Sequence, residues 1–190
     1  FNIFNRKFIF YFLIFIVFIY FYYDYNKNLK IEKASILYNK IIYSFYNSDF
    51  HTVSCLSNFI IKQYNDTYYS NCSLLLLSAI NYKKNNYNNS IFYLKNLVDN
   101  SNNYLNYVAV VRLCKMFYSN NMINESFYFI DKLKNDVYFS LYEELKGDIF
   151  FYVNSNDKAK IAYYTAFRNI KFYYNIFSIK IKVNNLGFIL

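Results

Sequence analysis

The stretch LYEELKGDIFFYVNSNDKAKIAYYTAF, residues Leu141–Phe167, decides the fold. Its apolar residues recur at the three- and four-residue spacing of amphipathic helices, on both sides of a short polar turn at Asn154. Gly147, one of only 2 glycines in the chain, stands inside the first of these helices, where glycine costs about 1 kcal/mol relative to alanine. We therefore expect Gly147 to mark a close approach between the two helices of a hairpin.

Similar hairpins precede this one at a nearly constant interval. Their turns, rich in Asn or Ser, centre on Asn85, Asn121 and Asn154, which are 36 and 33 residues apart. This interval is close to the ~34-residue period of tetratricopeptide repeats. Asn can end a helix in the left-handed conformation when Gly is absent, so we expect that role for all three. Small residues recur seven positions before and five positions after each Asn: Ser78 and Ser90, Cys114 and Ser126, Gly147 and Ala159.

The repeat pattern predicts an all-α solenoid of antiparallel helical hairpins, because such units bury their apolar faces only by stacking. A weaker unit comes first, with Leu37–Tyr46 as first helix, Ser48-Asp49 as turn and Val53–Ile61 as second helix. Ile41 and Val53 occupy its small positions, which leaves the register of this unit open. Phe177–Leu186 is expected to cap the C-terminal end, so the repeat domain is expected over residues 34–190.

The N-terminal part carries one long apolar run, Phe8–Tyr23, between Arg6-Lys7 and Asp24. At ~1.5 Å per residue it spans about 24 Å, slightly less than the ~30 Å hydrocarbon core of a bilayer. The run predicts a transmembrane helix over residues 8–23, preceded by a stub over 1–7 and followed by a linker over 24–33. A cleaved signal peptide is the main alternative, but no small-residue cleavage site follows. Lysines on both sides leave the orientation open.

The composition bounds the partners only loosely. The 190 residues are 56% hydrophobic and 25% aromatic, with no proline and a formal net charge of +9. The excess of Phe, Tyr, Ile, Asn and Lys affects every part of the chain, which indicates a bias toward AT-rich codons. Basic residues are spread along the chain rather than massed on one element, so we expect no nucleic-acid partner. A basic, Tyr-rich nucleic-acid binder is kept as the least favoured hypothesis for the function, and it requires the repeats to be cytoplasmic.

The residues offer no constellation for catalysis, a cofactor or a metal, and we expect none of the three. His51 is the only histidine, and the three cysteines have no C-x-x-C spacing. We expect the cysteines to be small helix residues, with a disulfide between Cys55 and Cys72 as a minor alternative. The carboxylate pairs Glu143-Glu144 and Glu144-Asp148 are better interpreted as a helix face than as an acid/base dyad. Glu144 and Asp148 would face one side of the helix, with Lys146 and Arg112 as their candidate counter-ions.

A solenoid offers a concave surface lined by the first helices of its hairpins. By repeat register the groove-facing candidates are Leu75, Ala79 and Tyr82, then Val108, Val111, Arg112 and Lys115, then Leu141, Glu144, Asp148 and Phe151. Packing explains the apolar members at least as well as ligand contact does. The charged members Arg112, Lys115, Glu144 and Asp148 are more informative, because the pattern supplies no packing reason for them. Tyr82 and Phe151 complete the set of candidate partner-binding residues.

The C-terminal third resembles the end of the YfgM family, the ancillary subunits of the SecYEG translocon. The resemblance lies in a Glu-x-x-Gly-Asp helix, a second helix with small residues and an aromatic, and a closing Asn-Asn-Leu stretch. The matching residues are Glu144, Gly147, Asp148, Ala159, Lys160, Ala162, Tyr163, Lys182, Asn184, Asn185 and Leu186. YNDTYY, Tyr64–Tyr69, is similar to the family's link into the next hairpin. Asn154-Ser155 replaces the family's Gly-Asp turn, and Lys160 stands where Arg is common.

The resemblance implies a bacterial inner-membrane protein with one span, its N-terminus in the cytoplasm and its repeats in the periplasm. It also implies partners: the SecYEG translocon, a PpiD-like periplasmic chaperone and emerging secretory polypeptides. The leading hypothesis is therefore a membrane-anchored, non-catalytic adaptor at the translocon. The alternative is a structural tetratricopeptide scaffold of another envelope complex, which binds no clients.

Overall fold

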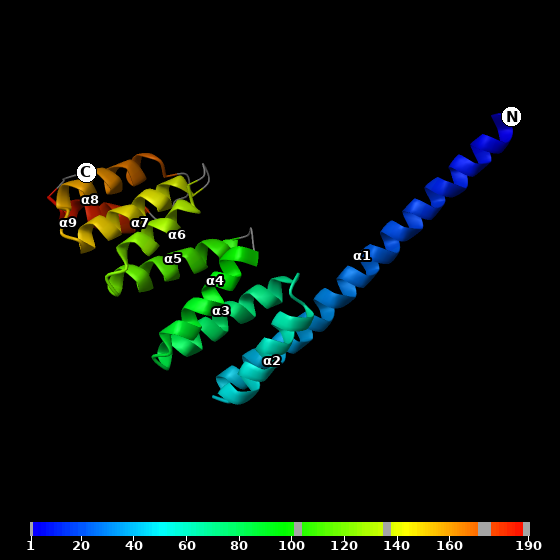
Figure 1. Ribbon diagram of the computed structural model, residues 1–190, viewed down its shortest axis with the longest axis horizontal. Helices are drawn as coiled ribbons and strands as arrows, with labels where there is room; N and C mark the ends of the chain where they lie inside the picture. The colour runs from blue at the N-terminus through cyan, green and yellow to red at the C-terminus, as the bar shows by residue number, and fades with distance from the viewer. Residues whose placement is uncertain (1, 101–103, 135–137, 171–175, 188–190) are drawn as a thin grey trace. The chain divides into compact units, whose positions relative to one another are not determined.

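The fold is known from a computed structural model that describes residues 2–100, 104–134, 138–170 and 176–187, with side chains from Tyr11 onward and not at Asn100. Phe1, the first residue of the predicted stub, lies outside this part of the chain. In the described residues every regular element is a helix, as predicted (Figure 1). The helices are α1 (Asn2–Tyr46), α2 (Phe50–Gln63), α3 (Tyr68–Lys83), α4 (Tyr87–Asn100), α5 (Tyr104–Ser119), α6 (Ile123–Asp131), α7 (Phe139–Tyr152), α8 (Asn156–Arg168) and α9 (Ile176–Asn185).

The chain divides into two compact units, residues 1–79 and 80–190, and α3 begins in the first and ends in the second. In the first unit, α1 and α2 form an antiparallel hairpin. Its core includes Ala34, Ile41, Val53 and Ile60, which are all fully buried. The hairpin is therefore held together mainly by apolar side chains from facing helical stripes.

The turn of this first hairpin settles its register. Ser48 has a φ of 60°, the left-handed conformation that the Asn residues of the later turns were expected to adopt. Ile41 and Val53 then stand seven positions before and five after the left-handed residue, as the small residues do in the other units. Asp49 caps α2, because its Oδ1 accepts a hydrogen bond from the backbone N–H of Thr52 at 3.1 Å.

The later turns repeat this geometry. Asn85, Asn121 and Asn154 have φ values of 58°, 61° and 59°, which confirms the predicted left-handed conformation. In all four turns the N–H of the next residue donates to the carbonyl five residues earlier, a Schellman-type closure that satisfies an orphan carbonyl of the preceding helix. These bonds, at 2.8–2.9 Å, are Asp49 to Ser44, Asn86 to Asn81, Met122 to Phe117 and Ser155 to Phe150.

The second unit holds α4 to α9. Antiparallel pairs α5 with α6 and α7 with α8 form its two complete hairpins, and α9 packs against α8 (Figure 1). Its core continues into α9, because Ile179 and Val183 are fully buried in one cluster with Ala159, Tyr163 and Ala166. The segment Phe177–Leu186 thus contributes the predicted C-terminal helix.

The segment 24–33, predicted as a linker, is helical, and α1 continues through it without a break from Asn2 to Tyr46. Neither Gly nor Pro occurs in α1, so no residue type in the segment ends the helix. The apolar run and the first helix of the first hairpin are therefore one rod. Every side chain from Tyr11 to Tyr23 is between 47% and 70% exposed.

None of the helices, as far as the chain is described, combines the length and the apolarity of a membrane-crossing segment.

The three cysteines are free thiols, Cys55 exposed, Cys72 half-buried and Cys114 buried. Cys55 and Cys72 therefore form no disulfide in this structure, contrary to the minor alternative. Burial raises the pKa of Cys114 to about 12, so this thiol stays protonated as a small core residue.

Candidate interaction surface

α7 and α8 approach each other closely at Gly147, as the sequence predicts. A Cβ on Gly147 would stand 2.5 Å from Cδ1 of the Tyr163 ring, far inside van der Waals contact. Tyr163 follows the buried Ala159 by one helical turn, and both side chains are nearly inaccessible to solvent. Ser57, Leu94 and Ile130 occupy the equivalent position in the other units. Because Tyr163, the largest of these four side chains, lies in the last hairpin, this hairpin requires the smallest residue, Gly147, opposite it.

The other predicted small positions are also buried, with Ser78 2% exposed and Ser90, Cys114, Ser126 and Ala159 fully buried. In the α5–α6 hairpin the small serine has a polar role as well. The hydroxyl of Ser126 donates to the backbone carbonyl of Cys114 at 2.9 Å, which ties the two helices together where they approach. The burial of these residues is consistent with the packing role that the repeat pattern predicts.

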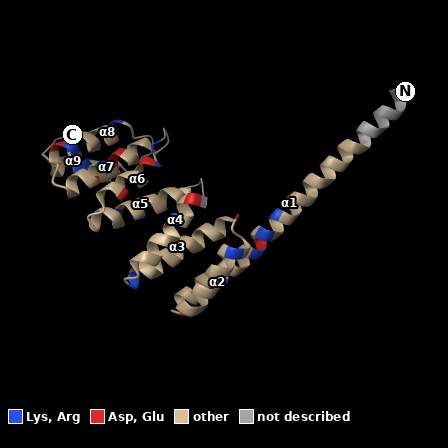
Figure 2. Ribbon diagram, viewed as in Figure 1, with Lys and Arg blue, Asp and Glu red and all other residues tan. Residues whose placement is uncertain are grey.

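A charged cluster joins α7 to α9. Lys182 Nζ lies 2.8 Å from Oε1 of Glu144 and 2.9 Å from Oδ2 of Asp148. The Tyr163 hydroxyl donates to Oδ1 of Asp148 at 2.8 Å, and the Ser178 hydroxyl donates to Oε1 of Glu144 at 3.1 Å. Figure 2 shows basic residues on α9 beside acidic residues on α7.

Burial and charge oppose each other in this cluster. Burial alone lowers the pKa of Lys182, but the carboxylates of Asp148 and Glu144 outweigh it and leave the pKa raised. The pKa of Tyr163 is also raised, first by burial and then by the charge of Asp148. The cluster therefore keeps the Lys182 ammonium charged and the Tyr163 phenol neutral.

These contacts correct one premise of the sequence analysis. Glu144 and Asp148 were expected to have no packing reason, yet Lys182 binds both, and their side chains are only 9% and 14% exposed. Arg112 was expected as a counter-ion, but it makes no ion pair with any described residue. Lys146, the other expected counter-ion of Glu144 and Asp148, pairs instead with Glu143, whose Oε1 lies 3.2 Å from the Lys146 ammonium.

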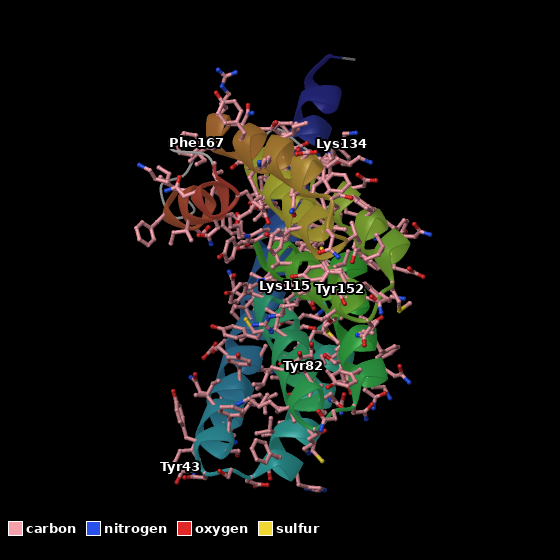
Figure 3. All side chains as sticks on the ribbon, turned by 90° about the vertical axis from the view of Figure 1, so that its left-hand side faces the viewer. Tyr43, Tyr82, Lys115, Lys134, Tyr152 and Phe167 are labelled. Atoms are coloured by element: carbon pink, nitrogen blue, oxygen red, sulfur yellow. The ribbon has the colours of Figure 1, made fainter. Side chains whose placement is uncertain are left out.

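Arg112 and Lys115, the two basic residues of α5, differ from Lys146 and Lys182 in having no acidic partner among the described residues. Arg112 and Lys115 are both exposed and make no salt bridge within the described part of the chain. One further turn along α5, Tyr118 packs against Tyr152 of α7 with 5.3 Å between ring centroids. The spacing of three residues puts the α5 side chains on one side of the helix. We call Arg112, Lys115, Tyr118 and Tyr152 the α5/α7 face; Lys115 and Tyr152 can be located in Figure 3.

The aromatic pair of this face is held in place by polar contacts. The Tyr152 hydroxyl lies 3.4 Å from the carbonyl of Ser119 and 3.3 Å from Oδ1 of Asn121, so it links α7 to the turn after α5. Burial, followed by the charge of Asp148, raises the pKa of Tyr118 to about 12. Tyr152 nevertheless remains 40% exposed, so part of its ring is available to a partner.

The remaining groove candidates divide into exposed and packed residues. Phe151 is 54% exposed next to Tyr152, whereas Leu141 is 7% exposed and belongs to the core. Tyr82 is 50% exposed, and its ring contacts that of Tyr87 in an edge-to-face pair with centroids 5.4 Å apart. Half-buried positions are Leu75, Ala79, Val108 and Val111. Among the predicted binding residues, only Arg112 and Lys115 lie together as exposed charges.

The pairing of Lys182 with the α7 carboxylates and the pairing of Tyr118 with Tyr152 were not predicted from the sequence. A signal for the first exists, because Ser178 and Lys182 are four residues apart, as are Glu144 and Asp148. Each pair lies on one face of its helix, so a row of hydrogen-bond donors can meet a row of carboxylates across two helices. The rotation of α9 about its own axis is not encoded in that spacing.

A family model for the tetratricopeptide repeat-like domain matches residues 5–188, nearly the whole chain. The chain belongs to this tetratricopeptide repeat-like family. The match agrees with the four turns of equal geometry and with the small positions around them. No curated protein and no solved structure matches the chain.

Tetratricopeptide repeat-like domains typically serve as non-catalytic scaffolds or adaptors for other proteins. Membership in the family therefore supports a protein partner in general. The exposed α5/α7 face of this tetratricopeptide repeat-like chain is its best candidate for contact with such a partner.

Proposed function

We propose that this chain is a membrane-anchored adaptor that binds polypeptides through its repeats. The observation that carries the proposal is the exposure of Tyr11–Tyr23 on a helix that runs directly into the first hairpin. Soluble monomers rarely expose contiguous apolar surface on this scale, and such surface marks contact with a membrane or another protein. No described helix has both the length and the apolarity needed to cross a membrane. The exposed side chains and the continuous apolar run Phe8–Tyr23 nevertheless support an anchor.

A bilayer is the occupant that this apolar rod favours. Apolar side chains surround it on all sides, whereas a helix that docks on a protein has one apolar stripe and one polar face. Tyr20, Tyr22 and Tyr23 gather at one end, where amphipathic rings prefer the headgroup region. The rod is therefore suited to lipid all round, with the repeats held next to the membrane.

The likeness to the YfgM family gives this adaptor its proposed setting. In this setting the N-terminus lies in the cytoplasm, the single span lies in a bacterial inner membrane and the repeats lie in the periplasm. The partners would be the SecYEG translocon, a PpiD-like chaperone and secretory polypeptides. Confinement beside the channel raises the effective concentration, so weak contacts at the α5/α7 face suffice for capture. The alternative is a structural scaffold of another envelope complex, with protein contacts but no clients.

Photocrosslinking in intact membranes tests this proposal. One probe replaces Phe15 in the apolar rod, a second replaces Arg112 on the α5/α7 face, and a control probe replaces Lys180, which is exposed on α9. We expect adducts with translocon or chaperone components at Phe15 and with secretory chains at Arg112. Adducts with lipid alone at Phe15 and with one fixed set of envelope proteins at Arg112 would favour the scaffold. Recovery of the chain in the soluble fraction would refute the anchor.

A further inference from the structure

The α5/α7 face presents cations to a partner, while the carboxylates of the neighbouring helix face are already satisfied. Arg112 and Lys115 are exposed and form no ion pair within the described residues. Glu144 and Asp148, the acidic residues of α7 in the same repeat register, are bound by Lys182 and are largely covered. Without Lys182, the two positive charges of α5 and the two negative charges of α7 would balance. With it, the charge left accessible on this side of the unit is positive.

The same face offers aromatic surface one turn from the cations. Tyr118 follows Lys115 by three residues and packs on Tyr152 at 5.3 Å between centroids. Phe151 adds an exposed ring next to Tyr152. Aromatic rings of this kind supply contact area at low cost in conformational entropy, because each has only two side-chain torsions.

From this arrangement we propose that the α5/α7 face selects unfolded polypeptide segments in which acidic residues lie next to aromatic or large aliphatic ones. This inference rests on the proposed polypeptide binding and names the class of segment that is bound. Arg112 and Lys115 pair with the carboxylates of the segment, and Tyr118, Phe151 and Tyr152 contact its apolar side chains. The guanidinium and ammonium groups stay hydrated, so the ion pairs contribute mainly to selectivity and to the rate of encounter.

The test is a titration of the full chain, in detergent micelles, with fluorescently labelled peptides. A peptide of Asp, Phe and Ser is compared with its amide isostere, in which every Asp is Asn, and with a Lys counterpart. We expect the acidic peptide to bind about three- to tenfold more tightly than the amide isostere at low salt. This advantage should shrink as salt screens the exposed cations.

Matched variants locate the effect. Replacing both cations, Arg112→Gln with Lys115→Gln, should abolish the advantage of the acidic peptide. Lys180→Gln removes one positive charge from an exposed position on α9, against two removed from α5, and should leave the advantage intact. An equal loss in the Lys180→Gln variant would show attraction by net charge alone and would overturn the inference.

Three further results would overturn the inference in distinguishable ways. Equal binding of the acidic peptide, its amide isostere and the Lys peptide would remove the selectivity while leaving polypeptide binding in place. No binding of any peptide would also remove the proposed adaptor function. An oligonucleotide that competes as well as the acidic peptide would indicate a general polyanion surface instead.

Discussion

Lys182 on α9 places its ammonium 2.9 Å from Oδ2 of Asp148 on α7, and the same nitrogen binds Glu144. One cation therefore satisfies two carboxylates on one face of a helix from the preceding hairpin. A largely buried carboxylate without a compensating cation is costly, so α9 supplies charge compensation as well as apolar packing. The last helix is thus a specific cap and not only an apolar lid.

Removing this cation should loosen α9. Lys182→Met keeps most of the side-chain volume but removes the cation that pairs with Glu144 and Asp148. We expect a loss of about 1–3 kcal/mol in the free energy of unfolding, since Lys182 is partly exposed. Hydrogen exchange should show faster exchange of the Ile179 and Val183 amides. Lys180→Met on the exposed side of α9 is the control and should change neither quantity. Unchanged protection of α9 in Lys182→Met would contradict a role for the ion pairs.

Substitution of Gly147 tests the packing of the last hairpin. Gly147→Ala gains about 1 kcal/mol of helix propensity but forces the Tyr163 ring away, and overpacking of this kind costs about 1–3 kcal/mol. Because the ring is anchored by its bond to Asp148, we expect a net loss of stability in chemical denaturation. Tyr163→Leu introduces the residue type of the equivalent Leu94 and should make Gly147→Ala less costly. Additive effects of the two substitutions would show that the two positions are not in contact.

The left-handed turns can be tested at Asn154, whose side chain is exposed, so that a substitution there acts mainly through the backbone conformation. Its φ of 59° suits Gly better than any residue with a Cβ, so Asn154→Gly should be neutral or stabilising. Asn154→Ala should cost about 1 kcal/mol, because alanine is strained in this conformation. Asn156→Ala in the first turn of α8 is the matched control with helical backbone. Equal melting temperatures for Asn154→Ala and Asn154→Gly would argue against the repeat geometry.

Alkaline pH should destabilise the second unit. The pKa values of Lys182 and Tyr163 are both raised in the folded chain, so the folded state retains these protons more strongly than the unfolded chain does. Their contribution is therefore fully present below the unfolded pKa values of about 10 to 10.5 and is lost as the pH rises above them. The melting temperature should fall above about pH 10 and fall less steeply in Lys182→Met. A flat profile in this range would contradict the assignment.

The repeat architecture was predictable because it depends on local chemistry. Asn85, Asn121 and Asn154 identify the turns by residue type, and the small residues around them follow from helix packing. The register of the first hairpin could not be predicted from the sequence, since Ile41 and Val53 are not small. It is fixed only by the left-handed conformation of Ser48.

The candidate site was predictable only in part. Arg112 and Lys115 were found because exposed cations at helical spacing are visible in the sequence. Glu144 and Asp148 were assigned to an open groove because the sequence does not reveal how α9 is rotated about its axis. That rotation is set by burial of Ile179 and Val183, and it brings Lys182 onto the carboxylates.

The central claim is that polypeptides bind at the α5/α7 face of a membrane-tethered chain. The most direct measurement places a photocrosslinking residue at Lys115 of the full chain in native membranes, with Lys180 as the control position. We expect adducts with polypeptide chains at Lys115 that disappear when an excess of the acidic peptide is added, and few adducts at Lys180. Equal adduct yields at both positions, unaffected by the peptide, would contradict it.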